Sequence, residues 1–150
     1  MKIERILLPT DFSEGSNNAL KYAASLSKEY GAKLYLMHVI HDISATAGWH
    51  VPHMQLDQIY KEMEENAAKD LERYCREALK EIKDIKTILV RGLPAEEIIK
   101  AASDEKIDLI VIGTYGRRGI ERIIFGSTAE KVVRSAPCPV LSVKVPEYKL

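Results

Sequence analysis

Five short apolar segments alternate with amphipathic ones along this chain, and that alternation limits the possible folds more than any other feature. The apolar segments have the length of strands and are rich in Ile, Leu and Val, as parallel strands covered on both faces tend to be. The pattern predicts one α/β domain over residues 1–150, with a parallel sheet and right-handed crossovers. The predicted strands are Ile3–Leu8, Leu34–Ile40, Ile85–Val90, Leu109–Ile112 and Val140–Val145.

The segments between these strands carry helical periodicity and helix-boundary signals. A helix is predicted over Asn18–Tyr30, with Gly31 as its C-cap. A longer helix is predicted over Gln55–Ile82, where apolar residues recur every three or four positions. A third helix should begin at Leu93–Glu97, with proline and acids in its first turn, and a fourth at Ser127.

The order of the strands predicts where a ligand would bind. Five strands of this kind form a doubly wound, Rossmann-like sheet with helices on both faces, and the expected strand order is 3-2-1-4-5. Ligands of such sheets bind at the carboxyl ends of the strands where the order reverses, here between strands one and four. The first strand ends in Pro9-Thr10-Asp11 and the fourth in Gly113-Thr114-Tyr115-Gly116, so these two segments should face each other.

Glycines follow the fourth strand at positions that suit close contact with an anion. Gly113, Gly116 and Gly119 recur every third residue, and Gly126 precedes the predicted helix start at Ser127. Glycine lets the backbone approach a ligand closely, and a helix N-terminus offers free N–H groups and partial positive charge. The segment has a local charge of +3, from Arg117, Arg118, Arg122, Lys131 and Arg134 against Glu121 and Glu130.

The residues alone leave two interpretations of this segment open. It is either a phosphate-binding loop, or a tight turn in which Ser127 and Glu130 form a capping box for the last helix. It is not a P-loop, because GxxxxGK[ST] is absent from the chain, and the dinucleotide fingerprint GxGxxG is absent as well.

The spacing Gly-x2-Gly-x9-Gly-Ser, formed by Gly113, Gly116 and Gly126-Ser127, resembles the nucleotide motif of the universal stress protein family, in particular its ATP-binding branch. The opening ILLPTDFSE, the strand LYLMHVI, the segment VRGLPAEEI and the ending GSTAEKVVRSAPCPVLSV are similar to this family too, so the resemblance covers essentially the whole chain. The sequence departs from the family at Tyr115, where many members have histidine.

The resemblance implies a set of contacts with ATP or AMP, and Mg²⁺ on the phosphates of ATP. It implies that Asp11 lies near the base or ribose and that the Val39 backbone meets the adenine. It also implies that the motif glycines and the start of the last helix line the ribose and phosphates. The expected contact residues are Pro9, Thr10, Asp11, Val39, Gly113, Gly116, Arg117, Gly126, Ser127 and Thr128.

Composition and charge restrict the possible partners and the compartment. Lys plus Arg and Asp plus Glu both number 22, and this balance argues against a general nucleic-acid or membrane-surface binder. Without a signal peptide or a membrane-length apolar stretch, and with two widely separated cysteines, the chain is expected in the cytoplasm with reduced thiols. The last strand, about Pro139–Val145, is expected at the sheet edge, and the resemblance implies a homodimer through it.

The leading hypothesis is a nucleotide-binding regulatory switch in the stress response. No GxSxG elbow or Cys/His arrangement is present, so at most slow ATP hydrolysis, or autophosphorylation at Ser127 or Thr128, is expected. Two alternatives stay open, an enzyme acting on adenine nucleotides and an interaction module that binds no nucleotide. The spacing of the four histidines fits no standard metal-ligand pair, and His38 is expected to be a strand residue.

Overall fold

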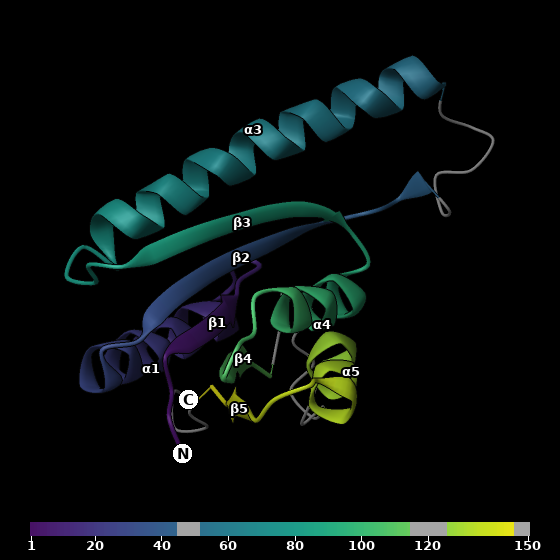
Figure 1. Cartoon of the computed structure of the whole chain (residues 1–150). Coiled ribbons are helices and arrows are strands. Elements are labelled where there is room, and N and C mark those ends of the chain that lie inside the picture. The colour runs from purple at the N-terminus through teal and green to yellow at the C-terminus, as the bar shows by residue number, and fades with distance from the viewer. Residues whose placement is uncertain (45–51, 115–125, 146–150) are drawn as a thin grey trace.

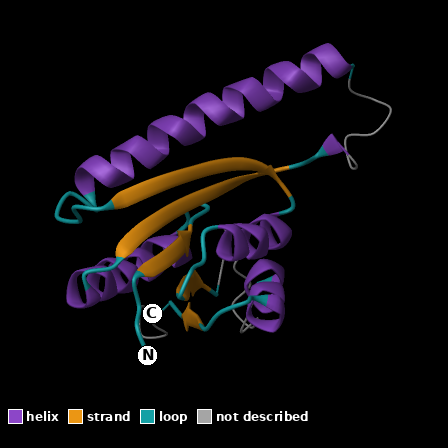
Figure 2. Ribbon diagram, in the orientation of Figure 1, coloured by secondary structure: helices purple, strands orange, loops and turns teal. Residues whose placement is uncertain are grey.

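A five-stranded parallel sheet forms the centre of the protein (Figures 1 and 2). The computed structural model describes residues 1–44, 52–114 and 126–145. The strand order is β3-β2-β1-β4-β5, with every neighbouring pair parallel, which confirms the predicted doubly wound sheet. The strands are β1 (Arg5–Pro9), β2 (Lys33–His41), β3 (Ile85–Gly92), β4 (Leu109–Gly113) and β5 (Val140–Val143).

Helices cover both faces of the sheet, so the central strands are buried on each side. The side chains of Ile6 and Leu8 pack on one face and that of Leu7 on the other, and all three are 0% exposed. This alternation follows from the two-residue period of a strand and explains why β1 is apolar at successive positions. The first face is covered by α1 (Glu14–Tyr30) and α3 (His53–Glu77), the second by α4 (Pro94–Asp104) and α5 (Ser127–Ser135).

Helix α1 begins at Glu14, four residues earlier than predicted. Ser13 is its N-cap, and its hydroxyl accepts a hydrogen bond from the Ser16 amide at 3.3 Å. The first turn is polar in sequence, but Gly15 and Ser16 are buried, and packing decides the helix start there. The predicted C-cap at the other end is confirmed, because Gly31 has the left-handed φ of 64° that glycine adopts without strain.

Helix α3 ends at Glu77, five residues before the predicted end at Ile82. The chain then turns, and the Leu79 amide donates to the Tyr74 carbonyl at 2.9 Å. This turn places Leu79 in the core, where it is 1% exposed. The apolar period continues past the helix because Leu79 and Ile82 still pack on the core, although they do so from a turn.

The two cysteines pack against opposite cores of the sheet. Cys75 contacts the core on the α1 and α3 face, and Cys138 contacts the core on the α4 and α5 face. Both are free and only partly accessible. Burial raises the pKa of each thiol, with a smaller contribution from Glu72 at Cys75 and from Asp108 at Cys138.

We therefore expect both thiols to react slowly with a disulfide reagent at pH 8. The thiolate is the nucleophile, and a raised pKa keeps each cysteine in the neutral thiol form there. The rate for folded protein should still be rising above pH 9, whereas protein in denaturant should titrate like a free cysteine. A fast stoichiometric reaction of the folded protein at pH 7 would contradict this expectation.

Candidate nucleotide-binding site

Strands β1 and β4 separate at their carboxyl ends, as the topology requires for a crevice. Among the described residues they pair only at Ile6–Leu109 and Leu7–Ile110, although β1 runs on to Pro9 and β4 to Gly113. Pro9 has no N–H to donate to a neighbour. The next residue stays with β2 instead, since the Thr10 amide donates to the Met37 carbonyl at 2.8 Å.

The loop after β1 holds Asp11 at the start of α1. The Asp11 Oδ1 atom accepts a hydrogen bond from the Ser16 hydroxyl at 2.6 Å and one from the Ser13 amide at 3.0 Å. The Thr10 hydroxyl accepts from the Phe12 amide at 3.0 Å. Asp11 thus lies immediately before α1, where a helix N-terminus has partial positive charge.

Phe12 follows Asp11 in an unusual backbone conformation. Its φ of 63° lies in the left-handed region, which costs a residue other than glycine about 1–3 kcal/mol. The Phe12 ring lies 4.7 Å from the His38 ring of β2 and 5.2 Å from the Tyr74 ring of α3. Burial raises the pKa of Tyr74, so its hydroxyl stays protonated and donates to Asn17 of α1 at 2.5 Å.

The end of β4 touches the first turn of α1. A methyl group added at Gly113 would lie 2.6 Å from the Gly15 carbonyl oxygen and 3.1 Å from the Ser16 amide nitrogen. Real side chains do not approach that closely, so only glycine permits this contact. Glycine at this position therefore brings β4 against the turn that holds Asp11.

The N-terminus of α5 lies on the other side of the β4 end. The Gly126 amide donates to the Thr114 carbonyl at 2.6 Å, and the Thr114 amide donates to Val143 of β5 at 3.0 Å. Gly126 is the N-cap, and Ser127 is the first helical residue. The predicted capping box at Ser127 and Glu130 is therefore wrong.

Helix α5 has no side-chain cap within the part of the chain that is described. The amides of its first turn, those of Ser127, Thr128 and Ala129, have no acceptor within the helix, because the first amides of any α-helix lack one. Ser127 is exposed and Thr128 partly exposed. These N–H groups are suitable for binding an anion.

The structure brings most of the predicted contact residues to one end of the sheet. Asp11 contacts Ser16, the preceding Gly15 lies against Gly113, and the following Thr114 is bonded to Gly126. Val39 lies near the carboxyl end of β2, paired with Val90 of β3. The predicted contacts Gly116 and Arg117, and the departure at Tyr115, lie outside the described residues.

Sequence reasoning assigned five basic residues to a phosphate-binding rim, and two of them are described. Lys131 lies 3.5 Å from Glu96 of α4, and Arg134 lies 2.9 Å from Glu130 one turn earlier. All four side chains are exposed, so these ion pairs contribute little to stability. They nevertheless direct both cations to carboxylates of α4 and α5.

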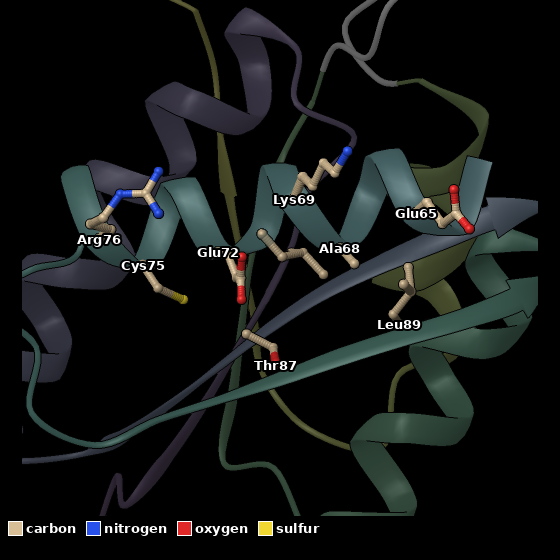
Figure 3. A pocket seen from close by; sticks show the side chains of 9 residues that line it. Glu65, Ala68, Lys69, Glu72, Cys75, Arg76, Thr87 and Leu89 are labelled. Atoms are coloured by element: carbon tan, nitrogen blue, oxygen red, sulfur yellow. The ribbon is translucent and has the colours of Figure 1, made fainter. Parts of the chain in front are cut away.

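A groove of about 820 Å³ lies elsewhere, between α3 and β3 (Figure 3). Leu71 and Leu89 contribute apolar surface to it, while Glu65, Lys69, Glu72 and Arg76 of α3 line it with charge. Two acids and two bases give no net attraction for phosphate. We therefore do not assign a phosphate-binding role to this groove, which is separate from the crevice between β1 and β4.

Sequence reasoning missed several residues that shape the crevice. Thr114 is 1% exposed and joins β4, β5 and α5, but a threonine after a strand gives no signal of that role. Ser16 carries the stronger signal, since an Asp followed by two serines at a helix start is typical of hydrogen-bonded caps. The contact between Phe12 and His38 could not be foreseen, because it depends on a left-handed residue.

The strand order and the helices on both faces define a doubly wound, Rossmann-like α/β protein, and comparison with known proteins gives its family. The sequence profile described as Universal stress protein family matches residues 2–144, so the chain belongs to the universal stress protein family. None of the helices within the described ranges is long and apolar enough to cross a membrane.

Individual relatives resemble this chain over nearly its whole length. Universal stress protein MJ0531 of Methanocaldococcus jannaschii is 38% identical, with 96% of this chain and 84% of that protein covered. The solved structure of MJ0577 from the same organism has a TM-score of 0.87 at 32% identity, covering 98% and 99% of the two chains. A universal stress protein from Archaeoglobus fulgidus, solved in complex with dAMP, has a TM-score of 0.58 at 25% identity, covering 96% and 100%.

Substitutions at two glycines of the site should differ sharply in stability. Gly113→Ala should lower the free energy of unfolding by about 1–3 kcal/mol, because the new methyl group collides with the backbone of α1. Gly126→Ala is the matched control, since its methyl group would lie 3.2 Å from the Thr114 oxygen and needs only a small shift. Urea unfolding measures both, and equal losses would contradict the contact described here.

Proposed function

We propose that this protein binds an adenine nucleotide, ATP or AMP, in the crevice between the carboxyl ends of β1 and β4. One observation carries the proposal: the N-terminus of α5, which has no side-chain cap among the described residues, lies beside the end of β4, and the turn that holds Asp11 lies against the same strand end. Amides and a helix dipole attract phosphate at one place. On the β1 side of the crevice, the Asp11 carboxylate can accept hydrogen bonds from a ribose hydroxyl or an amino group.

Each contact residue then has a defined role. The Ser127 and Thr128 amides and hydroxyls donate to phosphate oxygens. Gly113 lets β4 approach the turn that holds Asp11, and Gly126 lets the start of α5 lie beside Thr114. Asp11 accepts from the ribose or base, and the backbone near Val39 meets the adenine. The dAMP complex of the relative from Archaeoglobus fulgidus supports an adenine nucleotide as the ligand.

Mg²⁺ would accompany ATP through the phosphates rather than through a protein cage. The described ranges contain no group of three His, Cys, Asp or Glu side chains that could hold a metal ion. Mg²⁺ commonly keeps several waters and is held by one or two carboxylates and substrate phosphates.

We propose a regulatory role in the cytoplasm, in which the bound nucleotide changes what the protein interacts with. Helix-terminal amides position a phosphate, and Ser127 and Thr128 place hydroxyls beside it, so slow hydrolysis or autophosphorylation is compatible with the site. An enzyme acting on adenine nucleotides would instead turn over at about 1 s⁻¹ or faster. A nucleotide-free interaction module would show no ligand effect on stability.

We further propose a homodimer through β5. Pro139 and Val143 direct their carbonyl groups toward β4, so the intervening Val140 and Ser142 direct their backbone groups to the open edge of the sheet. Leu141 is 36% exposed beside this edge. An unpaired apolar edge strand is suited to pairing with a second copy of itself.

A pair of substitutions at Ser127 tests the nucleotide site. Ser127→Pro removes the first helical N–H, and proline suits this position because Gly126 already has φ −68° and ψ 157°. Ser127→Ala removes only the hydroxyl. We expect calorimetry to show nucleotide affinity falling about tenfold or more from the alanine to the proline variant, since hydrogen bonds to charged groups contribute about 1.5–3 kcal/mol.

The wild-type protein provides the reference for this test. ATP or AMP at 100 times its Kd should stabilise the fold by about 2.7 kcal/mol in thermal unfolding, measured with and without Mg²⁺. Absence of any shift with ATP, AMP or cyclic AMP in a folded sample would refute nucleotide binding.

The dimer has its own test at Ser142. Ser142→Pro removes an edge-facing N–H that the pairing of two β5 strands would use, while Ser142→Ala keeps it. Sedimentation equilibrium should give twice the 16.9 kDa chain mass for the wild type and the alanine variant, and a monomer for the proline variant. A wild-type monomer at high micromolar concentration would rule this interface out.

A further inference from the structure

The loop that carries Asp11 makes a hydrogen bond with His38, a residue outside the expected set of nucleotide contacts. The Nδ1 atom of His38, on β2, lies 2.7 Å from the Thr10 carbonyl oxygen, immediately before Asp11. A carbonyl oxygen only accepts, so Nδ1 must carry the proton and donate. This bond fixes the tautomer of His38 and the orientation of the Thr10–Asp11 peptide plane.

The same histidine also supports the residue on the other side of Asp11. Its ring packs on Phe12 with 4.7 Å between the ring centroids, and Phe12 in turn meets Tyr74 edge-on. Phe12 has a left-handed φ, so neighbouring groups must hold its conformation. His38 therefore acts on both residues that flank Asp11, through a hydrogen bond on one side and a ring contact on the other.

We propose that His38 is a positioning residue for nucleotide binding, which holds the peptide before Asp11 and the ring after it so that the carboxylate faces the crevice. This inference rests on the proposed nucleotide site. The local bonds from Ser13 and Ser16 set the Asp11 carboxylate relative to α1. The His38 side chain adds a second bond between this loop and β2, beside the backbone bond from the Thr10 amide to the Met37 carbonyl. It thereby fixes the Thr10 carbonyl relative to β2, the strand that carries Val39 near the proposed adenine position.

Asparagine and glutamine separate the hydrogen bond from the general effect of losing histidine. The amide nitrogen of asparagine is separated from Cα by the same number of bonds as Nδ1 of histidine, and that of glutamine by the same number as Nε2. His38→Asn can therefore still donate to Thr10, while His38→Gln cannot place its donor there. Both variants lose the ring contact with Phe12, so each is the control for the other.

Titration calorimetry with AMP and with ATP, together with the melting temperature of the ligand-free proteins, tests the proposal. We expect His38→Gln to bind about tenfold more weakly than His38→Asn, as the upper range for one hydrogen bond allows, while their ligand-free melting temperatures agree closely. Equal Kd values for the two variants, or a Kd difference that only follows a difference in melting temperature, would overturn the positioning role.

A spectroscopic measurement checks the tautomer without any substitution. Nitrogen-15 NMR of the wild-type protein should identify Nδ1 as the protonated nitrogen of neutral His38, and a proton on Nε2 instead would overturn the bond to Thr10. Titration of the wild-type protein distinguishes failure of the proposed function from failure of the His38 role. If no adenine nucleotide binds, the proposed function and this inference both fail; if the nucleotide binds and the two variants match, only the inference fails.

Discussion

The contact between Gly113 and the first turn of α1 determines the geometry of this end of the molecule. It brings the end of β4 within a distance of the Gly15 backbone that no residue with a side chain tolerates. Since the same turn holds Asp11 through Ser16, the contact also sets the relation between β4 and the carboxylate after β1. The carboxyl ends of β1 and β4 are thus held in place by contacts with the first turn of α1 rather than by hydrogen bonds between the two strands.

The arrangement around this contact places opposite polarities at the two sides of a crevice. One helix N-terminus is capped by Ser13 and accompanied by an acid, so its partial positive charge is already balanced. The other, that of α5, begins at a glycine with no side-chain cap in the described chain, and the acid of its first turn, Glu130, forms an ion pair with Arg134. This difference between two otherwise similar helix starts explains why phosphate is proposed at α5 and not at α1.

Much of the fold could be predicted because it follows from periodicity. The apolar runs gave the five strands, and the alternation gave their order, since parallel crossovers allow few topologies. The ends of helices were harder to predict, as the start of α1 and the end of α3 show. A buried polar turn at Gly15 and Ser16, and a leucine at position 79 that reaches the core from a turn, both depend on tertiary packing that no local pattern records.

The site was predictable to the extent that its chemistry lies in short motifs. Gly126 and Ser127 were predicted as contacts from the spacing of the family motif. The capping box was assigned to the wrong residue, because Ser-x-x-Glu also occurs one position inside a helix. Long-range contacts such as that between His38 and Thr10 join residues 28 positions apart, and no motif links them. Residues that position others are therefore the part of a site that a single sequence shows least.

The hydrogen bond between the Thr114 carbonyl and the Gly126 amide has a consequence for how such a domain can diversify. It joins the chain just before residue 115 to the chain just after residue 125, and Thr114 is itself tied to β5. Helix α5 is thereby anchored from outside the intervening stretch. A domain of this kind can therefore vary in sequence between residues 114 and 126 while these backbone bonds keep α5 beside β4 and β5.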